Sequence, residues 1–145
     1  TTALSGPGAA VVGMRWLGEN SGFDNLITLD VGGTSTDVAL ISDGRYTMTT
    51  AGSVAGFPLK TPMLDVLSIG AGGGSIAHQA ADTRWHVGPE SAGATPGPAC
   101  YGRGGEAPTL TDAQLILGRI PSALLGGSVP LDQARAKNAL ETFGQ

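Results

Sequence analysis

The sequence has little charge, few aromatic residues and no basic stripe. Charged residues make up 14% of the 145 positions and aromatic residues 5%, whereas charged residues alone take about 25% of a typical globular chain. The net charge is −4, and the eight lysines and arginines are scattered along the chain. Binding to nucleic acid or to an anionic membrane surface needs clustered cations. We therefore expect neither as a partner.

Long apolar runs and paired cysteines are also missing. No run approaches the roughly 20 residues of a membrane-spanning helix, and the first residues lack the basic start of a signal peptide. The one cysteine, Cys100, cannot form an internal disulfide, which fits a reducing compartment and predicts a cytoplasmic protein. The chain begins at Thr1 without methionine. We expect it to be an internal segment of a longer protein.

Glycine, in contrast, is abundant. It occupies 24 of the 145 positions, well above the usual share of about 7%. Many of these glycines lie in clusters that also contain proline, such as residues 88–105. Such a stretch excludes long regular elements. The composition indicates a folded domain with a small core and many backbone positions that only glycine tolerates.

The hydrophobic pattern predicts antiparallel hairpin strands followed by glycine-rich loops and helices. This is an α/β arrangement, with α+β as the alternative. A short helix is expected over residues 9–17. Asp43-Gly44 is a strong hairpin signal, and Asp37, Ala39 and Ile41 should share one strand face. The expected strands cover residues 26–30, 36–41, 45–50 and 66–69.

The second half predicts two helices after the proline–glycine loop. Thr111 and Gln114 have the spacing of a capping box at a helix start. The apolar stripe expected behind it consists of Ala113, Ile116, Leu117 and Ile120. A last helix should begin near Pro130 and Asp132. We expect it to turn Ala136, Leu140 and Phe143 inward and to end at Gly144.

The stretch 30–37 is the most informative for function. Glycines at a strand end allow backbone N–H groups to approach a polyphosphate, and the hydroxyls beside them add donors. Asp30 could hold Mg²⁺ through water, and Asp37 could orient a nucleophile. The same pattern also fits a tight hairpin whose side chains satisfy turn amides. The candidate phosphate-binding residues are Gly32, Gly33, Thr34, Ser35 and Thr36.

Residues 29–38 resemble the second phosphate motif of the actin, sugar-kinase and heat-shock-chaperone ATPase fold. Further motifs narrow the resemblance to the hydantoinase A / 5-oxoprolinase family. They occur in the family's order at residues 69–77, 87–94, 96–105, 109–113 and 117–119. The resemblance spans nearly the whole chain. It implies a partial actin-like, ribonuclease H-like ATPase lobe, with residues 1–145 as one incomplete segment of the second lobe.

The resemblance implies an enzyme that uses ATP and Mg²⁺ to phosphorylate the oxygen of a cyclic amide, after which the ring opens. A nucleotide-binding subunit of an acetone-type carboxylase is the alternative, and a non-catalytic lobe for structure or subunit docking is another. The implied partners are the substrate, the remaining lobes and a hydantoinase B-type subunit. Asp30 and Asp37 would be catalytic, with Asp30 also at the metal. A second tier of contacts would come from Gly72, Gly73, Gly74 and Ser75.

Two positions depart from many relatives, which place histidine where Leu67 stands and asparagine where Gln114 stands. A Leu67 that replaces a substrate- or metal-binding histidine would weaken the transfer of the relatives' chemistry. Phosphate binding would be untouched. We also expect Gly33 to need a left-handed backbone and a Cβ there to block a phosphate, so that Gly33→Val would damage function and folding more than Asp30→Ala.

Other chemistries fit the sequence less well. Residues 70–75 begin like a dinucleotide fingerprint, but Ser75 replaces the third glycine. Residues 89–93 approach the serine nucleophile elbow, with proline at its first position. Cys100 is expected to be a buried structural thiol rather than a nucleophile. Four further residues could be metal ligands but lack a recognised spacing, namely Asp65, His78, Asp82 and His86.

Overall fold

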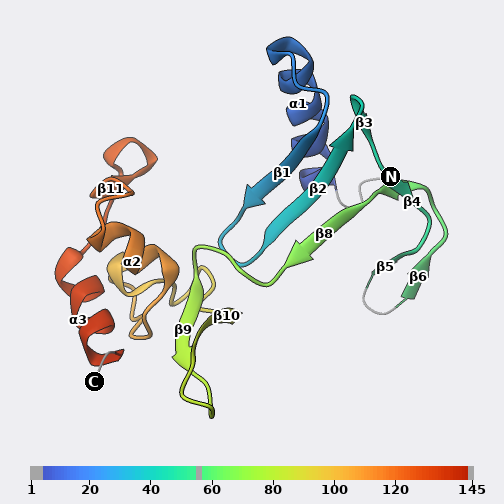
Figure 1. Cartoon of the computed structure of the whole chain (residues 1–145). Helices are drawn as coiled ribbons and strands as arrows, with labels where there is room; N and C mark the ends of the chain where they lie inside the picture. The colour runs from blue at the N-terminus through green and yellow to red at the C-terminus, as the bar shows by residue number, and fades with distance from the viewer. Residues whose placement is uncertain (1–4, 55–56, 144–145) are drawn as a thin grey trace. The chain divides into compact units, whose positions relative to one another are not determined.

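The computed structural model describes residues 5–54 and 57–143, which form two compact units (Figure 1). The first contains the chain up to Asp30 and residues 37–69, and the second contains residues 31–36 and everything from Gly70. Both units combine helices with antiparallel strands, which confirms the mixed fold class expected from the sequence.

The first unit is a sheet with one helix. Its four-stranded sheet has the order β1-β2-β3, and β8 also pairs with β2. Figure 1 shows the arrows of β1 and β8 running opposite to that of β2. The elements are α1 (Ser5–Ser21), β1 (Leu26–Val31), β2 (Thr36–Ser42), β3 (Arg45–Tyr46) and β8 (Val66–Ile69). Two short antiparallel ribbons complete it, β4 (Met48–Thr49) with β7 (Met63–Leu64) and β5 (Gly52–Val54) with β6 (Phe57–Leu59).

Helix α1 is longer than expected, because the glycines and proline near its start do not prevent it. Pro7 lies in the first turn, where a backbone N–H has no helical partner and its absence costs little. Val11 on this helix packs with Ala39 and Ile41 of β2 in the buried core of the unit. The predicted inward face of β2 is thereby confirmed. Within the described residues, no helix combines the length and the apolar character needed to cross a membrane.

The hairpin predicted at Asp43-Gly44 is confirmed. Both residues adopt positive φ, 50° and 68°, as a type I′ turn requires. The single strand expected over residues 45–50 is wrong. The strand is interrupted at Thr47, whose carbonyl accepts from the Asp65 amide at 2.9 Å. The segment after the break pairs with β7 instead of continuing along β2.

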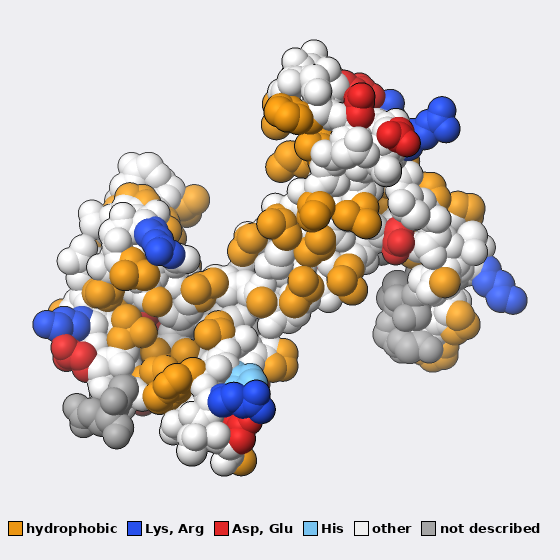
Figure 2. All heavy atoms as spheres, in the orientation of Figure 1, with side chains coloured by type: hydrophobic (Ala, Val, Ile, Leu, Met, Phe, Trp, Pro, Cys, Tyr) orange, Lys and Arg blue, Asp and Glu red, His pale blue; other side chains and the backbone are white. Residues whose placement is uncertain are grey.

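The outer face of the sheet is apolar and open. Side chains alternate along a strand, so the neighbours of the buried residues point outward. Figure 2 shows hydrophobic side chains gathered over these strands. The exposed residues are Ile27, Leu29, Leu40, Leu67 and Ile69. Leu67 is 66% exposed on this face.

The second unit begins with a hairpin that the sequence analysis missed. Strands β9 (Ser75–Gln79) and β10 (Trp85–Ser91) pair antiparallel, although residues 88–105 were expected to contain no regular element. The ladder shifts between Val87 and Ser91. Gly88 takes a φ of +73° within this irregularity, which accommodates the following proline without ending the strand.

The N-cap of helix α2 (Leu110–Ile116) lies two residues before the predicted one at Thr111. The actual box joins Thr109, which has an extended backbone, to Asp112. The shift makes the predicted stripe wrong at two positions, whereas Ile120 packs against the core of the unit as expected. Leu115 is the buried apolar residue of the helix, whereas Ile116 and Leu117 are 43% and 62% exposed.

Asp112 is fully buried and accepts four hydrogen bonds. Its donors are the amides of Ala99, Cys100 and Thr109, at 3.3, 2.8 and 3.0 Å, and the Thr109 hydroxyl at 2.7 Å. This carboxylate ties the turn η1 (Ala99–Tyr101) to the start of α2. Burial and the neighbouring Asp112 raise the pKa of the Cys100 thiol to about 12. Cys100 is therefore a protonated core residue rather than a nucleophile.

The rest of the second unit packs on this junction. Its core contains Cys100, Leu115, Leu131 and Ala136. The remaining elements are β11 (Ala123–Leu124), η2 (Leu125–Gly127), β12 (Val129–Pro130) and α3 (Gln133–Phe143). The predicted last helix is confirmed, with Ala136 fully buried. The predicted end at Gly144 lies outside the described residues.

Replacing Asp112 tests how much this junction contributes. Asp112→Ala leaves buried amides without an acceptor, so we expect the free energy of unfolding to fall by about 3 kcal/mol or more. Asp132→Ala is the matched control. Asp132 is exposed and accepts from the Arg135 amide at the start of α3, and its loss should cost about 1 kcal/mol. Urea denaturation followed by circular dichroism gives both values, and equal losses would contradict the assigned role.

Candidate functional site: a carboxylate pair and a glycine-supported loop

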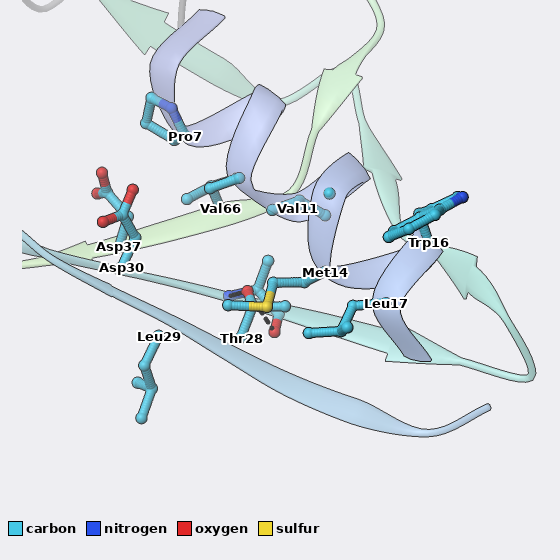
Figure 3. Close-up of a pocket in the computed structure, with 13 residues that line it drawn as sticks. Pro7, Val11, Met14, Trp16, Leu17, Thr28, Leu29, Asp30, Asp37 and Val66 are labelled. Carbon is cyan, nitrogen blue, oxygen red and sulfur yellow. Dashed lines mark hydrogen bonds between the residues drawn. The ribbon is translucent and has the colours of Figure 1, made fainter. Parts of the chain in front are cut away.

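Asp30 and Asp37 lie on the inner face of the sheet in the first unit. Asp30 is two residues after the buried Thr28, and Asp37 is two residues before the buried Ala39, so the period of two places all four on one side. Thr28 fixes the two strands, because its hydroxyl accepts from the Ala39 amide at 3.1 Å. Both carboxylates line one pocket (Figure 3). The strand periodicity brings the two predicted catalytic residues together.

This pocket has a volume of about 430 Å³ and a mainly apolar lining. The helix α1 contributes Val11, Met14 and Leu17, and Figure 3 shows Asp30 and Asp37 together away from Met14 and Leu17. Asp37 accepts a hydrogen bond from the Ser68 hydroxyl, while Asp30 is exposed. Two carboxylates are hard oxygen donors of the kind that Mg²⁺ prefers, with water filling its remaining positions. The pair fits such an ion.

The predicted phosphate loop belongs to the second unit and is a tight turn. The Gly32 amide donates to the Ser35 carbonyl at 2.8 Å and closes the turn. Thr36 donates its hydroxyl to the Ala71 carbonyl at 2.5 Å. Two glycine amides then donate to the carbonyls of the loop, Gly73 to Gly32 at 2.9 Å and Gly74 to Gly33 at 2.6 Å. The loop is therefore hydrogen-bonded to the backbone of residues 71–74.

We call residues 72–74 the glycine bed, because the loop lies directly against their backbone. A Cβ at Gly72 would stand 2.7 Å from both the Gly32 carbonyl oxygen and the Thr34 nitrogen. At Gly74 it would stand 2.9 Å from the Gly33 carbonyl oxygen. Distances this short exclude any side chain unless the backbone moves. The bed needs glycine because two backbone segments meet there.

The donors of the glycine bed are already in use. The Gly72 amide donates to the Ser75 hydroxyl at 2.8 Å, and the Ser75 amide donates to the Gly72 carbonyl at 3.0 Å. With Gly73 and Gly74 bound to the loop, these residues support the loop's position. The tip differs: within residues 5–54 and 57–143, the amides of Gly33, Thr34 and Ser35 have no protein acceptor. These three donors are available for an anion.

Gly33 itself does not need a left-handed backbone, so that expectation is wrong. Its φ lies outside the positive range, and a Cβ there would meet no atom within 4 Å. The positions where a side chain would clash are Gly72 and Gly74, which lie against the backbone of the loop. Sequence reasoning missed this because it assigned the bed to ligand contacts, and only its long glycine run could have signalled a close backbone approach.

A second cavity lies beside the glycine bed, with a volume of about 360 Å³. Gly73, Thr111 and Gln114 line it, and Arg119 is its one charged lining residue. Thr111 holds the bed in place, since its amide and its hydroxyl both donate to the Gly73 carbonyl at 2.8 Å. The cavity therefore brings the cationic side chain of Arg119 and the glycine-bed residue Gly73 into one lining.

The structure also bears on two alternative motifs and on the departure at Leu67. A dinucleotide fingerprint needs a helix after its glycines, but β9 begins at Ser75, so that alternative is excluded. In the segment that approaches a nucleophile elbow, the Ser91 hydroxyl accepts from the Gly93 amide at 3.1 Å. This hydrogen bond is a local turn contact. Leu67 lies on the outer face of the sheet, whereas Val66 beside it lines the carboxylate pocket.

The sequence profile described as Hydantoinase/oxoprolinase matches residues 1–145. The chain belongs to this family. It is 45% identical to the caprolactamase subunit alpha of Pseudomonas jessenii over 139 residues, which cover 95% of this chain and 20% of that protein.

Two solved structures share the fold. One is the ATP-dependent caprolactamase from Pseudomonas jessenii, with a TM-score of 0.79, 43% identity and coverage of 94% of this chain and 20% of that one. The other is the nucleotide-free acetone carboxylase from work on ATP-dependent acetone carboxylation, with a TM-score of 0.80, 34% identity and coverage of 96% and 20%. The chain thus spans about a fifth of the length of these relatives.

Paired glycine substitutions test the loop support. Gly72→Ala pushes a Cβ into the backbone of the loop, so we expect the free energy of unfolding to fall by about 2 kcal/mol or more. Gly33→Ala adds a Cβ in open space and should change it by less than about 0.5 kcal/mol. Chemical denaturation measures both, and amide NMR spectra should show shifts at Thr34 in Gly72→Ala. If Gly33→Ala were the more damaging, the assigned contact would be wrong.

Proposed function

We propose that this chain is part of an ATP-dependent amidohydrolase that opens a cyclic amide after phosphorylating its carbonyl oxygen. The observation that carries the proposal is the loop 32–36, held from behind by the glycine bed and presenting three free amides at its tip. Backbone donors of this kind bind phosphate oxygens. The family match and the ATP-dependent relatives support nucleotide as the source of that phosphate.

In this proposal the chain supplies one side of the nucleotide site. The amides of Gly33, Thr34 and Ser35 would bind phosphate oxygens, and the Gly72–Ser75 segment would keep them in place. The chain would be one incomplete segment of the second lobe of an actin-like ATPase. Partner lobes and a hydantoinase B-type subunit would complete the enzyme, which is in keeping with a relative named as a subunit. A cytoplasmic location belongs to the same proposal.

Asp30 and Asp37 would hold Mg²⁺, with Asp30 as the principal ligand through water. Their oxygen donors and their common pocket fit that ion. When bound to this pair, Mg²⁺ would supply positive charge and Lewis-acid chemistry. Asp37 would orient the attacking group, and its hydrogen bond from Ser68 would fix its rotamer. These roles rest on residue chemistry and on the shared face of the two strands.

The chemistry explains why ATP is needed. Resonance with the nitrogen makes an amide carbon a weak electrophile, so water attacks it slowly. Transfer of the terminal phosphoryl group to the amide oxygen activates the carbon. Water then adds, the C–N bond breaks and the ring opens as an acyl phosphate, with a proton passing to the leaving nitrogen. A second water hydrolyses the acyl phosphate to carboxylate and phosphate. Positioned donors lower the barrier by meeting the charge that develops during transfer. Caprolactam, the substrate named by the matched relative, is a cyclic amide.

A nucleotide-binding subunit of an acetone-type carboxylase is the second candidate. The 34% identical acetone carboxylase structure favours it, because phosphorylation of a carbonyl oxygen serves both reactions. The two differ in what reacts next, water or a carbon nucleophile with bicarbonate. ATP hydrolysis by the full-length protein, measured with cyclic amides and separately with ketones plus bicarbonate, distinguishes them. A lobe that serves only docking would respond to neither.

Replacing Asp30 tests the carboxylate pair. In the full-length protein, Asp30→Ala should abolish Mg-ATP turnover and leave the circular dichroism spectrum and melting temperature unchanged, since Asp30 is exposed. Asp24→Ala is the matched control, because Asp24 is exposed in the turn before β1. A phosphate-release assay measures turnover. Wild-type turnover in Asp30→Ala, or an unfolded variant, would contradict the assignment.

The isolated 145-residue chain should show no substrate-dependent ATP hydrolysis. Phosphoryl transfer needs donors and metal arranged around the whole phosphoryl group, and the described residues supply one loop. Weak Mg-ATP association should persist, because the tip amides need no further lobe. Calorimetry and phosphate release, each with and without hydantoin, 5-oxoproline or caprolactam, provide the test. Turnover at the rate of the full-length protein would show that the segment is a self-sufficient enzyme.

A further inference from the structure

The hairpin β9–β10 brings the two histidines of the chain face to face. His78 pairs directly with His86 across the antiparallel ladder, and these are the only histidines in the sequence. Their ring centroids are 5.7 Å apart and the ring planes differ by 20°. Both are among the four possible metal ligands named from the sequence, which shows no recognised spacing, and their pairing depends on a hairpin that was not predicted.

This spacing is close to that of two imidazoles on one metal ion. Metal–nitrogen bonds of about 2.0–2.1 Å place each ring centre about 3.2 Å from Zn²⁺, so a tetrahedral angle separates the two centres by about 5 Å. The observed 5.7 Å approaches that value. Because the rings are now stacked nearly parallel, both side chains must also rotate, so that one in-plane nitrogen of each ring points at the same ion.

Neither ring is engaged elsewhere. In the part of the chain that the structure describes, no hydrogen bond involves either imidazole, and Nδ1 of His78 is buried without a partner. His78 therefore has Nε2 left for an outside ligand. His86 is exposed. The nearest charged pair of the hairpin is neutralised internally, since Arg84 Nε donates to Asp82 at 2.5 Å.

The other side chains of the hairpin point away from the pair. Trp85 and Val87 flank His86 in sequence and so lie on the opposite face, where Trp85 contacts Phe143 with ring centroids 4.4 Å apart. No group of three or more metal-ligating side chains occurs among the described residues. Any ion at this hairpin would thus take two imidazoles from the chain and fill its remaining positions with water.

We propose that His78 and His86 form a two-histidine binding site for a divalent transition metal ion, with Zn²⁺ as the expected ion. Imidazole is a preferred ligand for Zn²⁺, Ni²⁺ and Cu²⁺, and a bond from each strand would link β9 to β10. The second bond forms within one molecule, so it adds affinity beyond a single histidine. Cys100 does not compete, because its thiol is buried and protonated. The proposal is independent of the nucleotide site.

Titration of the chain with zinc chloride tests the site. Calorimetry should give one Zn²⁺ per chain for the wild type, and His78→Ala and His86→Ala should each weaken binding by about tenfold or more. Val87→Ala is the matched control and should bind as the wild type does, since Val87 is half-exposed on the other face. Zn²⁺ should raise the melting temperature of the wild type and of the control alone.

NMR of the unmodified chain gives a second test that no folding defect can obscure. All imidazole signals come from these two residues, so Zn²⁺ should shift both rings together and with the same concentration dependence. Wild-type affinity in either histidine variant would overturn the proposal. So would a shift of one ring alone, or no binding up to about 1 mM Zn²⁺.

Discussion

The contact between two stretches of bare backbone is the constraint on which the second unit depends. Loop carbonyls at Gly32 and Gly33 accept from amides at Gly73 and Gly74, and no side chain fits between them. The contact holds the loop, while the amides at its tip have no acceptor among the described residues. It also positions α2, because Thr111 binds the Gly73 carbonyl from the other side. Glycine content, which weakens regular elements, here stabilises a specific geometry.

Local patterns predicted the first unit well, because its elements depend on short-range signals. The period of two placed Ala39 and Ile41 inward, and Asp43-Gly44 specified its turn without help from distant residues. The strand expected over residues 45–50 failed for the opposite reason. Its two halves pair with different strands, and the sequence of a strand does not indicate which strand it pairs with.

The second unit was harder to predict, since its structure depends on burial. Asp112 is the acidic residue of the capping box, and it also accepts hydrogen bonds from the amides of Ala99 and Cys100. The sequence of the helix alone does not indicate that these distant amides need an acceptor. The β9–β10 hairpin was not predicted because Gly88 argues against a strand. In the structure, Gly88 lies at an irregularity of the ladder, and the strand continues past it. The candidate site likewise has a part that residue types indicate and a part that depends on tertiary contacts. Loop and carboxylates were evident from residue types, whereas the role of the glycine bed required knowing which backbone lies opposite it.

The adjacent residues Thr111 and Asp112 give the first turn of α2 two attachments in opposite directions. Thr111 binds the glycine bed, and Asp112 binds the turn at Ala99 and Cys100. We therefore expect these segments to open and close as one cooperative unit rather than as separate loops. The amides of Gly73 and Gly74 should exchange with solvent at the rate set by α2, and much more slowly than those at the loop tip. The loop thus combines a donor surface accessible to ligand with a base as persistent as the helix behind it.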